Sequence, residues 1–429
     1  MIAVLGAGAA GLAAALELRD GGHEVVVLEA SDRAGGKVGT MREGGYTMER
    51  AALGLLDREG ILAPLAARLG IVPVPAGEKA RRRWVVRDGV RHALPSGPLS
   101  LLTTRLFTFR EKLSLLREPW RKPLAVPEES VAAFFARRLG LPGSFLGDAI
   151  QSGVYAGDPD RLELASAFPT LEKLEREHGS LVRGARHLPK ARLASFAGGL
   201  GELMGAMAAA VAPVLRLGVR ARAVHRTGPN YRISTLEGAG LGELECDAIV
   251  CALPAPDAAS ALETLDADLA ARLRELRAAP LALVHLGVAR RSLRGPVDGF
   301  GVLAPGRAVV GTLFPDALWE GRAPQGSALI SALVGGARNP QAASLPDDEL
   351  VDLVRSESRL FEGAPDLVRV VRWPQAVPQY EPGHARRVDV IEGLAARHPR
   401  LALAGSWYRG VGVLDCLRQG RAAARAAAT

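Results

Sequence analysis

The residues with the clearest chemical pattern are three glycines near the amino terminus, Gly6, Gly8 and Gly11, and the acidic residue Glu29 that follows them. In this spacing the first glycine makes a tight turn, the second lets the backbone approach a pyrophosphate, and the third lets a helix pack closely on a strand. Glu29 lies 18 residues after Gly11, close to the spacing of about 20 expected of an acid that binds a ribose hydroxyl. The pattern predicts a dinucleotide site, and the acid favours FAD or NAD over NADP.

The segments around these glycines must hold them in place. Residues 1–5 and 24–28 are each predicted to form a buried strand. Residues 12–19 are predicted to form a helix, which ends at Gly21 and Gly22. A phosphate would rest at the start of this helix, where free N–H groups and the helix dipole favour negative charge. The alternative is a glycine-rich turn that binds nothing, but the strand, the helix and the acid all agree with a dinucleotide site.

A second group of residues, Arg33, Gly35, Gly36 and Lys37, follows the acid directly. A glycine pair at this point lets the backbone pass close to a large, flat cofactor, and Arg33 or Lys37 is available for phosphate. The arrangement resembles that of the amine-oxidase-type flavoproteins, in which an arginine, two glycines and a basic residue follow the acid. This resemblance favours FAD over NAD.

The composition excludes several classes of protein. The chain has 429 residues, enough for two or three domains, and is 48% hydrophobic and 23% charged, which is ordinary for a globular protein. Its three cysteines, Cys246, Cys251 and Cys416, have no metal-ligand spacing, and its eight histidines are scattered. No metal site is therefore predicted, and the cysteine usage indicates a reducing compartment. No uninterrupted apolar run of about 18 residues predicts a transmembrane helix.

The net charge of +8 is concentrated in one segment. Residues 81–122 hold eleven Lys and Arg against three acidic residues, an excess equal to that of the whole chain. Leucines, phenylalanines and Trp120 lie between these charges, which suggests a membrane surface, an acidic substrate or nucleic acid, against the alternative of a solvated helical face. No nucleic-acid-binding motif accompanies the charge, so nucleic acid is not predicted as a partner.

The remaining chain alternates between strand and helix patterns. Residues 83–94 predict a hairpin that turns at Asp88 and Gly89, and residues 99–190 are largely helical, with a capped helix over 130–139. Further strands are predicted at 214–226, 231–236, 243–253 and 401–404, and a closing helix begins near Leu414.

Several longer stretches carry a closer resemblance, among them residues 152–159 (SGVYAGDP), 195–200 (SFAGGL), 299–301 (GFG), 373–380 (WPQAVPQY) and 408–416 (YRGVGVLDC). In this order they resemble the oxygen-dependent protoporphyrinogen oxidase family over most of the chain. The resemblance implies FAD-dependent oxidation of protoporphyrinogen IX to protoporphyrin IX in heme biosynthesis. Six electrons would leave in three two-electron steps, with O2 reduced to H2O2.

The resemblance also implies a fold of mixed α/β and α+β class. A Rossmann-type FAD-binding domain would be assembled from discontinuous segments (1–75, 191–255 and 380–429). A mixed-sheet substrate-binding domain would comprise 76–98 and 256–379, and a helical, membrane-facing insert would comprise 99–190. The protein would be cytoplasmic, with peripheral contact to the inner face of the cytoplasmic membrane and a homodimer left open.

Site residues follow from the same resemblance. Arg83 aligns with an arginine that pairs with a substrate propionate, a group that a guanidinium fork suits, and Arg81 and Arg82 are its rivals. Tyr155, Ala156 and Gly157 resemble the segment that approaches the reactive face of the substrate ring. No catalytic acid, base or nucleophile is predicted, because the flavin carries the chemistry. The predicted cofactor-binding residues are Gly6, Gly8, Ala9, Ala10, Gly11, Glu29, Ala30, Arg33, Gly35, Gly36, Lys37, Val224, Trp373, Gly405, Val411, Gly412 and Val413.

Three other functions stay open at this stage. Oxidation of coproporphyrinogen III, which carries four propionates instead of two, would require a pocket richer in arginine. An amine oxidase usually has a lysine beside the flavin in the later part of the chain, where this sequence has none after Lys190. A non-catalytic flavin-binding paralogue is kept open by Arg50, Ala51, Ala52 and Trp407, where the family has other residues.

Overall fold

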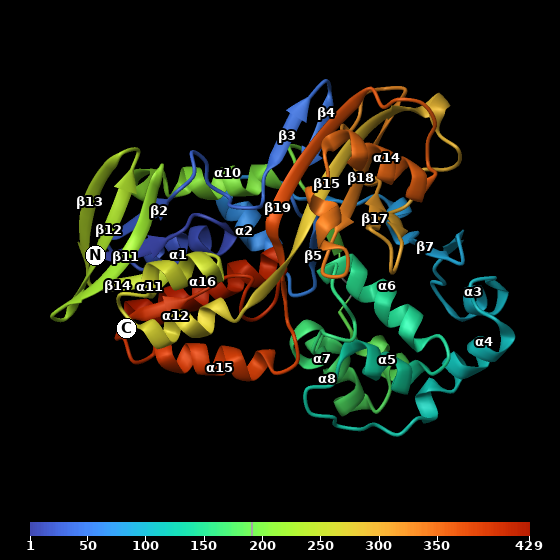
Figure 1. Ribbon diagram of the computed structural model, residues 1–429, viewed down its shortest axis with the longest axis horizontal. Coiled ribbons are helices and arrows are strands. Elements are labelled where there is room, and N and C mark those ends of the chain that lie inside the picture. Colours follow the sequence, from blue (N-terminus) through green and yellow to red (C-terminus); the bar gives the residue numbers. More distant parts are fainter. Residues whose placement is uncertain (190–191) are drawn as a thin grey trace.

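A five-stranded parallel sheet forms the centre of one lobe of the computed structural model, which describes residues 1–189 and 192–429 (Figure 1). Its strands come from the beginning, middle and end of the chain, in the order β10 (Leu215–Leu217), β2 (Val25–Glu29), β1 (Ile2–Leu5), β14 (Ala248–Cys251) and β20 (Leu401–Leu403). Alternate residues of β1 face opposite sides of the sheet, so Val4 packs in one apolar core and Leu5 in another. We call this part of the molecule the dinucleotide lobe.

Helices cover both faces of this sheet. One face packs against α1 (Ala9–Asp20), α10 (Leu200–Ala210) and α16 (Val413–Ala428), and the other against α11 (Ala255–Leu262), α12 (Ala267–Arg274) and α15 (His384–Ala395). Gly8 and Gly21 flank helix α1 as its capping residues, which confirms the helix predicted at the glycine turn. A separate antiparallel sheet of β11 (Val219–Thr227), β12 (Asn230–Glu237) and β13 (Gly240–Cys246) lies at the outer end of the lobe (Figure 1).

A seven-stranded sheet forms the second lobe, the sheet lobe, at the upper right of Figure 1. Its strand order is β19 (Leu367–Gln379), β15 (Arg277–Ala289), β18 (Ser327–Gly335), β17 (Val309–Leu313), β16 (Gly301–Leu303), β7 (Trp84–Arg87) and β8 (Val90–Ala93). Strands β7 and β8 are the predicted hairpin, and both turn residues, Asp88 (φ 52°) and Gly89 (φ 76°), are left-handed, as a tight hairpin requires. Helix α14 (Asp347–Ser358) packs on the face of this sheet away from the cavity described below.

Helices make up the third lobe, the helical lobe, at the lower right of Figure 1. They are α3 (Pro98–Thr103), α4 (Phe109–Leu116), α5 (Val131–Leu139), α6 (Gly143–Tyr155), α7 (Leu164–Ala167), α8 (Pro169–His178) and α9 (Leu181–Gly184). The Ser130 hydroxyl accepts a hydrogen bond of 3.2 Å from the Ala133 N–H, which confirms the predicted cap of α5. Within the described residues, no helix is long and apolar enough to cross a bilayer. The boundary that we predicted at residues 190 and 191 lies outside the described residues.

Smaller elements connect the lobes. A hairpin of β3 (Thr40–Glu43) and β4 (Tyr46–Glu49) lies against the sheet lobe, and helix α2 (Leu62–Leu69) is followed by Gly70, which has a left-handed φ of 68°. Strands β5 (Leu55–Asp57), β9 (Arg192–Ser195) and β6 (Val74–Pro75) form a short antiparallel sheet.

Two of the predicted strands are wrong as single elements. The strand predicted at 214–226 is divided at Gly218 (φ 72°), where the chain leaves the five-stranded sheet as β10 and enters another as β11. The strand predicted at 243–253 is likewise divided at Asp247 into β13 and β14, which belong to different sheets. Strand β19 was not predicted, because its residues Pro374 and Pro378 are not typical of a strand. As an edge strand it tolerates prolines that lack an N–H group.

Candidate active site

A cavity of about 2030 Å³ is lined by residues from all three lobes. Ligand sites usually measure about 300 to 1,000 Å³, so this cavity has room for a large cofactor and a large substrate together. The carboxyl ends of β1 and β2 and the beginnings of α1 and α16 line its dinucleotide side. The sheet lobe and the helical lobe line its substrate side.

The glycine turn after β1 has the geometry that its spacing predicted. Gly6 has a positive φ of 92°, and a Cβ atom added to Gly11 would lie 1.8 Å from the Gly6 carbonyl oxygen. Gly11 therefore lies under the turn rather than in the cavity lining. Gly8 lines the cavity, and a Cβ atom added there would meet nothing within 4 Å. The space in front of Gly8, at the start of α1, is the space that a pyrophosphate would need.

The second glycine pair packs directly on the first turn. The Gly35 N–H donates to the Ala7 carbonyl at 2.8 Å, and a Cβ atom on Gly36 would lie 3.2 Å from the Gly8 Cα atom. Both glycines have positive φ angles, 104° and 56°. The pair thus lets two backbone turns meet beside the cavity, which only residues without side chains allow.

Arg33 and Lys37, the two cations of this segment, donate hydrogen bonds to backbone carbonyls. The Arg33 guanidinium donates to the Gly36 carbonyl at 2.6 Å and to the Ala34 carbonyl at 3.3 Å, so it braces the glycine turn. The Lys37 ammonium donates to the Ala376 carbonyl at 2.8 Å and also to that of Gln375. Burial lowers the pKa of Lys37 to about 8. Both residues line the cavity and hold the backbone around it, and their contact with a phosphate stays a prediction.

Glu29 lies at the end of β2, with Ala30 beside it in the cavity lining. Its carboxylate accepts hydrogen bonds from the Ala7 N–H at 2.7 Å and the Ser31 N–H at 2.9 Å. A carboxylate accepts about four hydrogen bonds, so acceptor positions remain for ribose hydroxyls. These two hydrogen bonds hold the carboxylate at the edge of the cavity.

The later predicted cofactor residues, Trp373, Gly405, Val411, Gly412 and Val413, also line the cavity. Helix α16 begins after Gly412, so its N-terminus faces the cavity beside that of α1. The Trp373 indole donates to the Arg50 carbonyl at 2.7 Å, which fixes the loop that departs from the family pattern. Cys416 is buried in α16, and burial raises the pKa of its thiol to about 12, as expected of an inert side chain.

These features fit the predicted FAD. Gly8, Ala9 and Ala10 would hold the pyrophosphate, Glu29 the ribose, and the 405–412 loop with the start of α16 would lie against the flavin end. The fit rests on the open space at Gly8, the free acceptor positions of Glu29 and the two helix N-termini that share one cavity.

Over residues 1–189 and 192–429, the substrate side of the cavity is mainly apolar, with one cation. Its apolar lining comes from the sheet lobe (Leu281, Leu283, Phe300, Val302, Leu303, Val310, Leu313 and Leu333) and the helical lobe (Ile150, Val154, Tyr155, Phe168 and Leu171). Arg83 lies at its exposed edge, with its guanidinium 5.5 Å from the centre of the Phe300 ring. Arg82 pairs instead with Asp298, and Arg81 lies outside the lining. The geometry therefore selects Arg83 among the three arginines.

Three predicted site residues lie away from this cavity. Val224 is fully buried in a core of the dinucleotide lobe, and the part of β11 that reaches the cavity is residues 219–222. Ala156 has a left-handed φ of 46° at the end of α6, and neither it nor Gly157 lines the cavity. The Ala156 carbonyl accepts from the Ala337 N–H at 2.8 Å, and the Gly157 N–H donates to the Gln151 side chain of α6 at 2.8 Å. Gly153 and Val154 line the cavity with Tyr155.

Sequence reasoning missed two residues beside the site, Tyr380 and His384. Both are at most 2% exposed, and both donate hydrogen bonds to carbonyls of the 405–412 loop. The signal available was the polar sequence QYEPGH at 379–384, which interrupts an otherwise extended stretch. Its partners lie more than 20 residues further along the chain, so only the folded structure identifies them.

Comparison with known proteins gives a consistent result. The model of the flavin-containing amine oxidoreductase family matches residues 9–428. The chain is 27% identical to the coproporphyrinogen III oxidase of Bacillus subtilis, covering 100% of this chain and 98% of that one. It is 29% identical to the mitochondrial protoporphyrinogen oxidase of Nicotiana tabacum, covering 98% and 93%. A crystal structure from Exiguobacterium sp. 255-15, provisionally named a protoporphyrinogen oxidase, superimposes with a TM-score of 0.84 at 26% identity over 99% of this chain and 97% of that one.

Proposed function

Because the chain belongs to the flavin-containing amine oxidoreductase family, we propose that this oxidoreductase removes electrons from a porphyrinogen, a large apolar ring system with carboxylate side chains. A flavin held in the dinucleotide side of the cavity would supply the electron-accepting ring, with dioxygen as the final acceptor. Protoporphyrinogen IX is the substrate that we propose, with six electrons removed in three two-electron steps and H2O2 as the second product.

The observation that carries this proposal is the pairing of an apolar substrate side with one arginine at its edge. Arg83 has no acidic partner among the described residues, and Phe300 supports its guanidinium. A macrocycle with propionates on one edge would place its carboxylates at Arg83 and its ring among the leucines and valines. Such a bidentate pair orients the ring as well as binding it.

The residues around the ring would act by orientation and by excluding water. Leu281, Leu283 and Leu333 come from three positions on one face of the sheet lobe and present a continuous apolar surface. Tyr155 is 1% exposed, and its hydroxyl donates to the Ala167 carbonyl at 3.1 Å, so it contributes its ring and not a proton. Burial raises the pKa of this phenol far above its ordinary value, which fits a positioning role.

The same lining favours protoporphyrinogen IX over coproporphyrinogen III. Among the described residues that the sheet and helical lobes contribute to the cavity, Arg83 is the sole charged side chain. Coproporphyrinogen III would place two further propionates against leucine, valine and phenylalanine. Burying an ionised carboxylate without a partner is costly, so this substrate should bind less well.

The test offers both porphyrinogens to the FAD-loaded enzyme in air and follows porphyrin fluorescence and peroxide together. We expect faster fluorescence from protoporphyrinogen IX, with three peroxides for each porphyrin. Preference for coproporphyrinogen III would keep the chemistry and overturn the substrate. No fluorescence from either, with FAD bound, would overturn the oxidase function and favour a non-catalytic flavoprotein.

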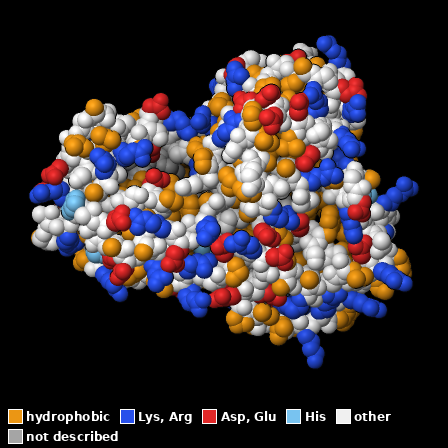
Figure 2. Space-filling view, viewed as in Figure 1, with side chains coloured by type: hydrophobic (Ala, Val, Ile, Leu, Met, Phe, Trp, Pro, Cys, Tyr) orange, Lys and Arg blue, Asp and Glu red, His pale blue; other side chains and the backbone are white. Residues whose placement is uncertain are grey.

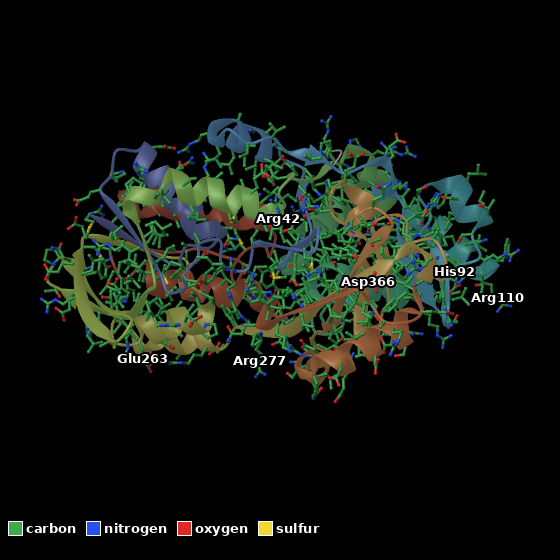
Figure 3. The ribbon with its side chains drawn as sticks, turned by 90° about the horizontal axis from the view of Figure 1, so that it is seen from above. Arg42, His92, Arg110, Glu263, Arg277 and Asp366 are labelled. Carbon is green, nitrogen blue, oxygen red and sulfur yellow. The ribbon has the colours of Figure 1, made fainter. Side chains whose placement is uncertain are left out.

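We also propose that the helical lobe rests on an anionic membrane surface. Leu99, Phe109 and Trp120 are more than three-quarters exposed, and Arg105 and Arg110 are exposed beside them. Figure 2 shows apolar and basic side chains mixed over this lobe, and Figure 3 shows Arg110 pointing away from its outer end. Such a mixture suits lipid headgroups above an apolar layer.

The test is sedimentation of the protein with lipid vesicles. The double variant Phe109→Ser with Trp120→Ser should sediment less with phosphatidylglycerol vesicles than the parent does. If the parent sedimented equally with phosphatidylcholine vesicles, the anionic preference would be contradicted.

A further inference from the structure

The 379–384 segment joins the end of β19 to the start of α15 and contacts both sides of the cavity. On the substrate side, the Gln379 side-chain amide donates to the Tyr155 carbonyl at 3.0 Å, and the Glu163 N–H donates to the Tyr380 carbonyl at 2.7 Å. These bonds attach the segment to α6 and to the chain before α7, in the helical lobe. Tyr155 itself lines the cavity.

On the dinucleotide side, two side chains of the segment hold the 405–412 loop. The Tyr380 hydroxyl donates to the Ser406 carbonyl at 2.8 Å and accepts from the Gly410 N–H at 2.9 Å. The His384 Nε2 atom bonds to the Tyr408 carbonyl at 2.8 Å, so the ring carries its proton there. The loop's own backbone contributes a longer bond, 3.4 Å from the Tyr408 N–H to the Gly405 carbonyl. Besides Gln419 of α16, whose amide donates to the Arg409 carbonyl at 2.8 Å, Tyr380 and His384 therefore hold the loop backbone in place.

The rings of the segment connect these two sets of bonds. Tyr380 and His384 stack at 3.9 Å with an angle of 15° between their planes, and the Tyr155 ring lies 5.6 Å from that of Tyr380. Tyr380 is fully buried and lies outside the cavity lining. A rigid aromatic group therefore runs from a residue on the substrate side to the loop on the cofactor side.

We propose that Tyr380 and His384 are positioning residues that fix the 405–412 loop against the bound flavin and link its position to the helical lobe. The loop leads directly into α16, whose N-terminus faces the cavity and favours negative charge there. A shift of the loop would change how tightly the flavin binds and how readily it accepts electrons. The effect on the flavin rests on membership of the family, and only the link to substrate rests on the proposed function.

The first test compares Tyr380→Phe with Tyr231→Phe in the FAD-loaded enzyme. Tyr231 is a matched control, because it is also fully buried and its hydroxyl donates one bond, to the Pro399 carbonyl at 2.7 Å, in a lobe region outside the cavity lining. We expect both variants to lower the melting temperature. Only Tyr380→Phe should weaken FAD binding, by roughly fivefold, and shift the visible flavin absorption and the midpoint potential.

A second pair of variants keeps the proposal testable if Tyr380→Phe does not fold. His384→Gln retains a donor for the Tyr408 carbonyl, whereas His384→Leu removes it. We expect His384→Gln to keep the flavin affinity and potential near those of the parent, and His384→Leu to lose them. Parent-like flavin affinity and potential in both Tyr380→Phe and His384→Leu would overturn the proposal. These readouts need no porphyrinogen, so they stand apart from failure of the proposed substrate.

Discussion

The two sides of the cavity are built by different means. On the dinucleotide side the contacts come from backbone, because Gly6, Gly8, Gly35 and Gly36 let two turns and a helix N-terminus meet without side chains. On the substrate side the lining is almost entirely apolar side chains, brought together from one face of a seven-stranded sheet and from α6 to α8. The first side is a local motif, and the second is a product of packing.

The difference explains how each side should respond to change. Where other backbone atoms pack directly on a glycine of the turn, there is no space for a side chain. A single added methyl group therefore disrupts the turn. An apolar wall of many side chains tolerates the loss of one member, because its neighbours continue to exclude water. Only Arg83, the one charged side chain that the described part of that wall contributes, is expected to behave like a residue of the dinucleotide side.

Two glycines give the largest expected contrast. Gly11→Ala places a Cβ atom 1.8 Å from the Gly6 carbonyl oxygen, so we expect it to destabilise the flavin-free protein by about 3 kcal/mol or more. Gly8→Ala meets no atom within 4 Å, so it should leave stability unchanged within about 0.5 kcal/mol and weaken FAD binding. Urea unfolding and FAD titration measure the two effects. Equal stability losses in the two variants would contradict the geometry of the turn.

Lowering the pH tests two buried histidines, His285 of the sheet lobe and His384 of the dinucleotide lobe. Burial lowers the pKa of His285, in the sheet lobe, and of His384 to about 4, from a usual value near 6.5. Between these values the unfolded chain binds more protons, so stability that is fully present above pH 6.5 is lost as the pH falls through 4. His285→Gln and His384→Gln should each reduce this loss by up to about 3 kcal/mol. Urea unfolding from pH 7 to 4 with excess FAD measures it, and a loss as steep as the parent's in both variants would argue against buried neutral rings.

Removing the arginine of the apolar wall should affect substrate binding and little else. Arg83→Ala deletes the proposed partner of a propionate, and hydrogen bonds to charged groups contribute about 1.5 to 3 kcal/mol, so KM should rise roughly 10- to 100-fold. Arg81→Ala is the matched control, since Arg81 is exposed nearby but does not line the cavity. Steady-state kinetics with protoporphyrinogen IX measures both variants. A similar KM in the two would remove Arg83 from the proposed site.

The smallest expected effect concerns the ring beneath that arginine. Phe300→Leu keeps the wall apolar but removes the aromatic face 5.5 Å from the Arg83 guanidinium. An exposed cation–π contact contributes about 0.5 to 1 kcal/mol, so KM should rise roughly two- to fivefold with little change in kcat. In the Arg83→Ala background the same substitution should have no further effect on KM, and an additive effect would show that Phe300 contacts the substrate directly.

Much of the dinucleotide side was predictable because its information is local. The turn, α1 and the end of β2 occupy one run of 29 residues, and hydrophobic runs and glycine spacing there directly reflect burial and close approach. The hairpin of β7 and β8 and the cap of α5 were predictable for the same reason. Arg33 and Lys37 were predicted at the cavity, but their hydrogen-bond partners were not, because the partners of Lys37 lie on β19.

The sequence by itself determined the cofactor motif, the helical and strand character of most segments, and the concentration of positive charge in residues 81–122. Only the tertiary structure decided that β10 and β11 part at Gly218, that Val224 is core, and that Arg83 rather than Arg82 faces the cavity. It also decided that Tyr380 and His384 meet a loop more than 20 residues away. The spacing of residues along the chain determines local turns and which side of a helix or strand is apolar. A site made of distant segments depends instead on which helices and sheets pack together, and this packing is a property of the whole fold.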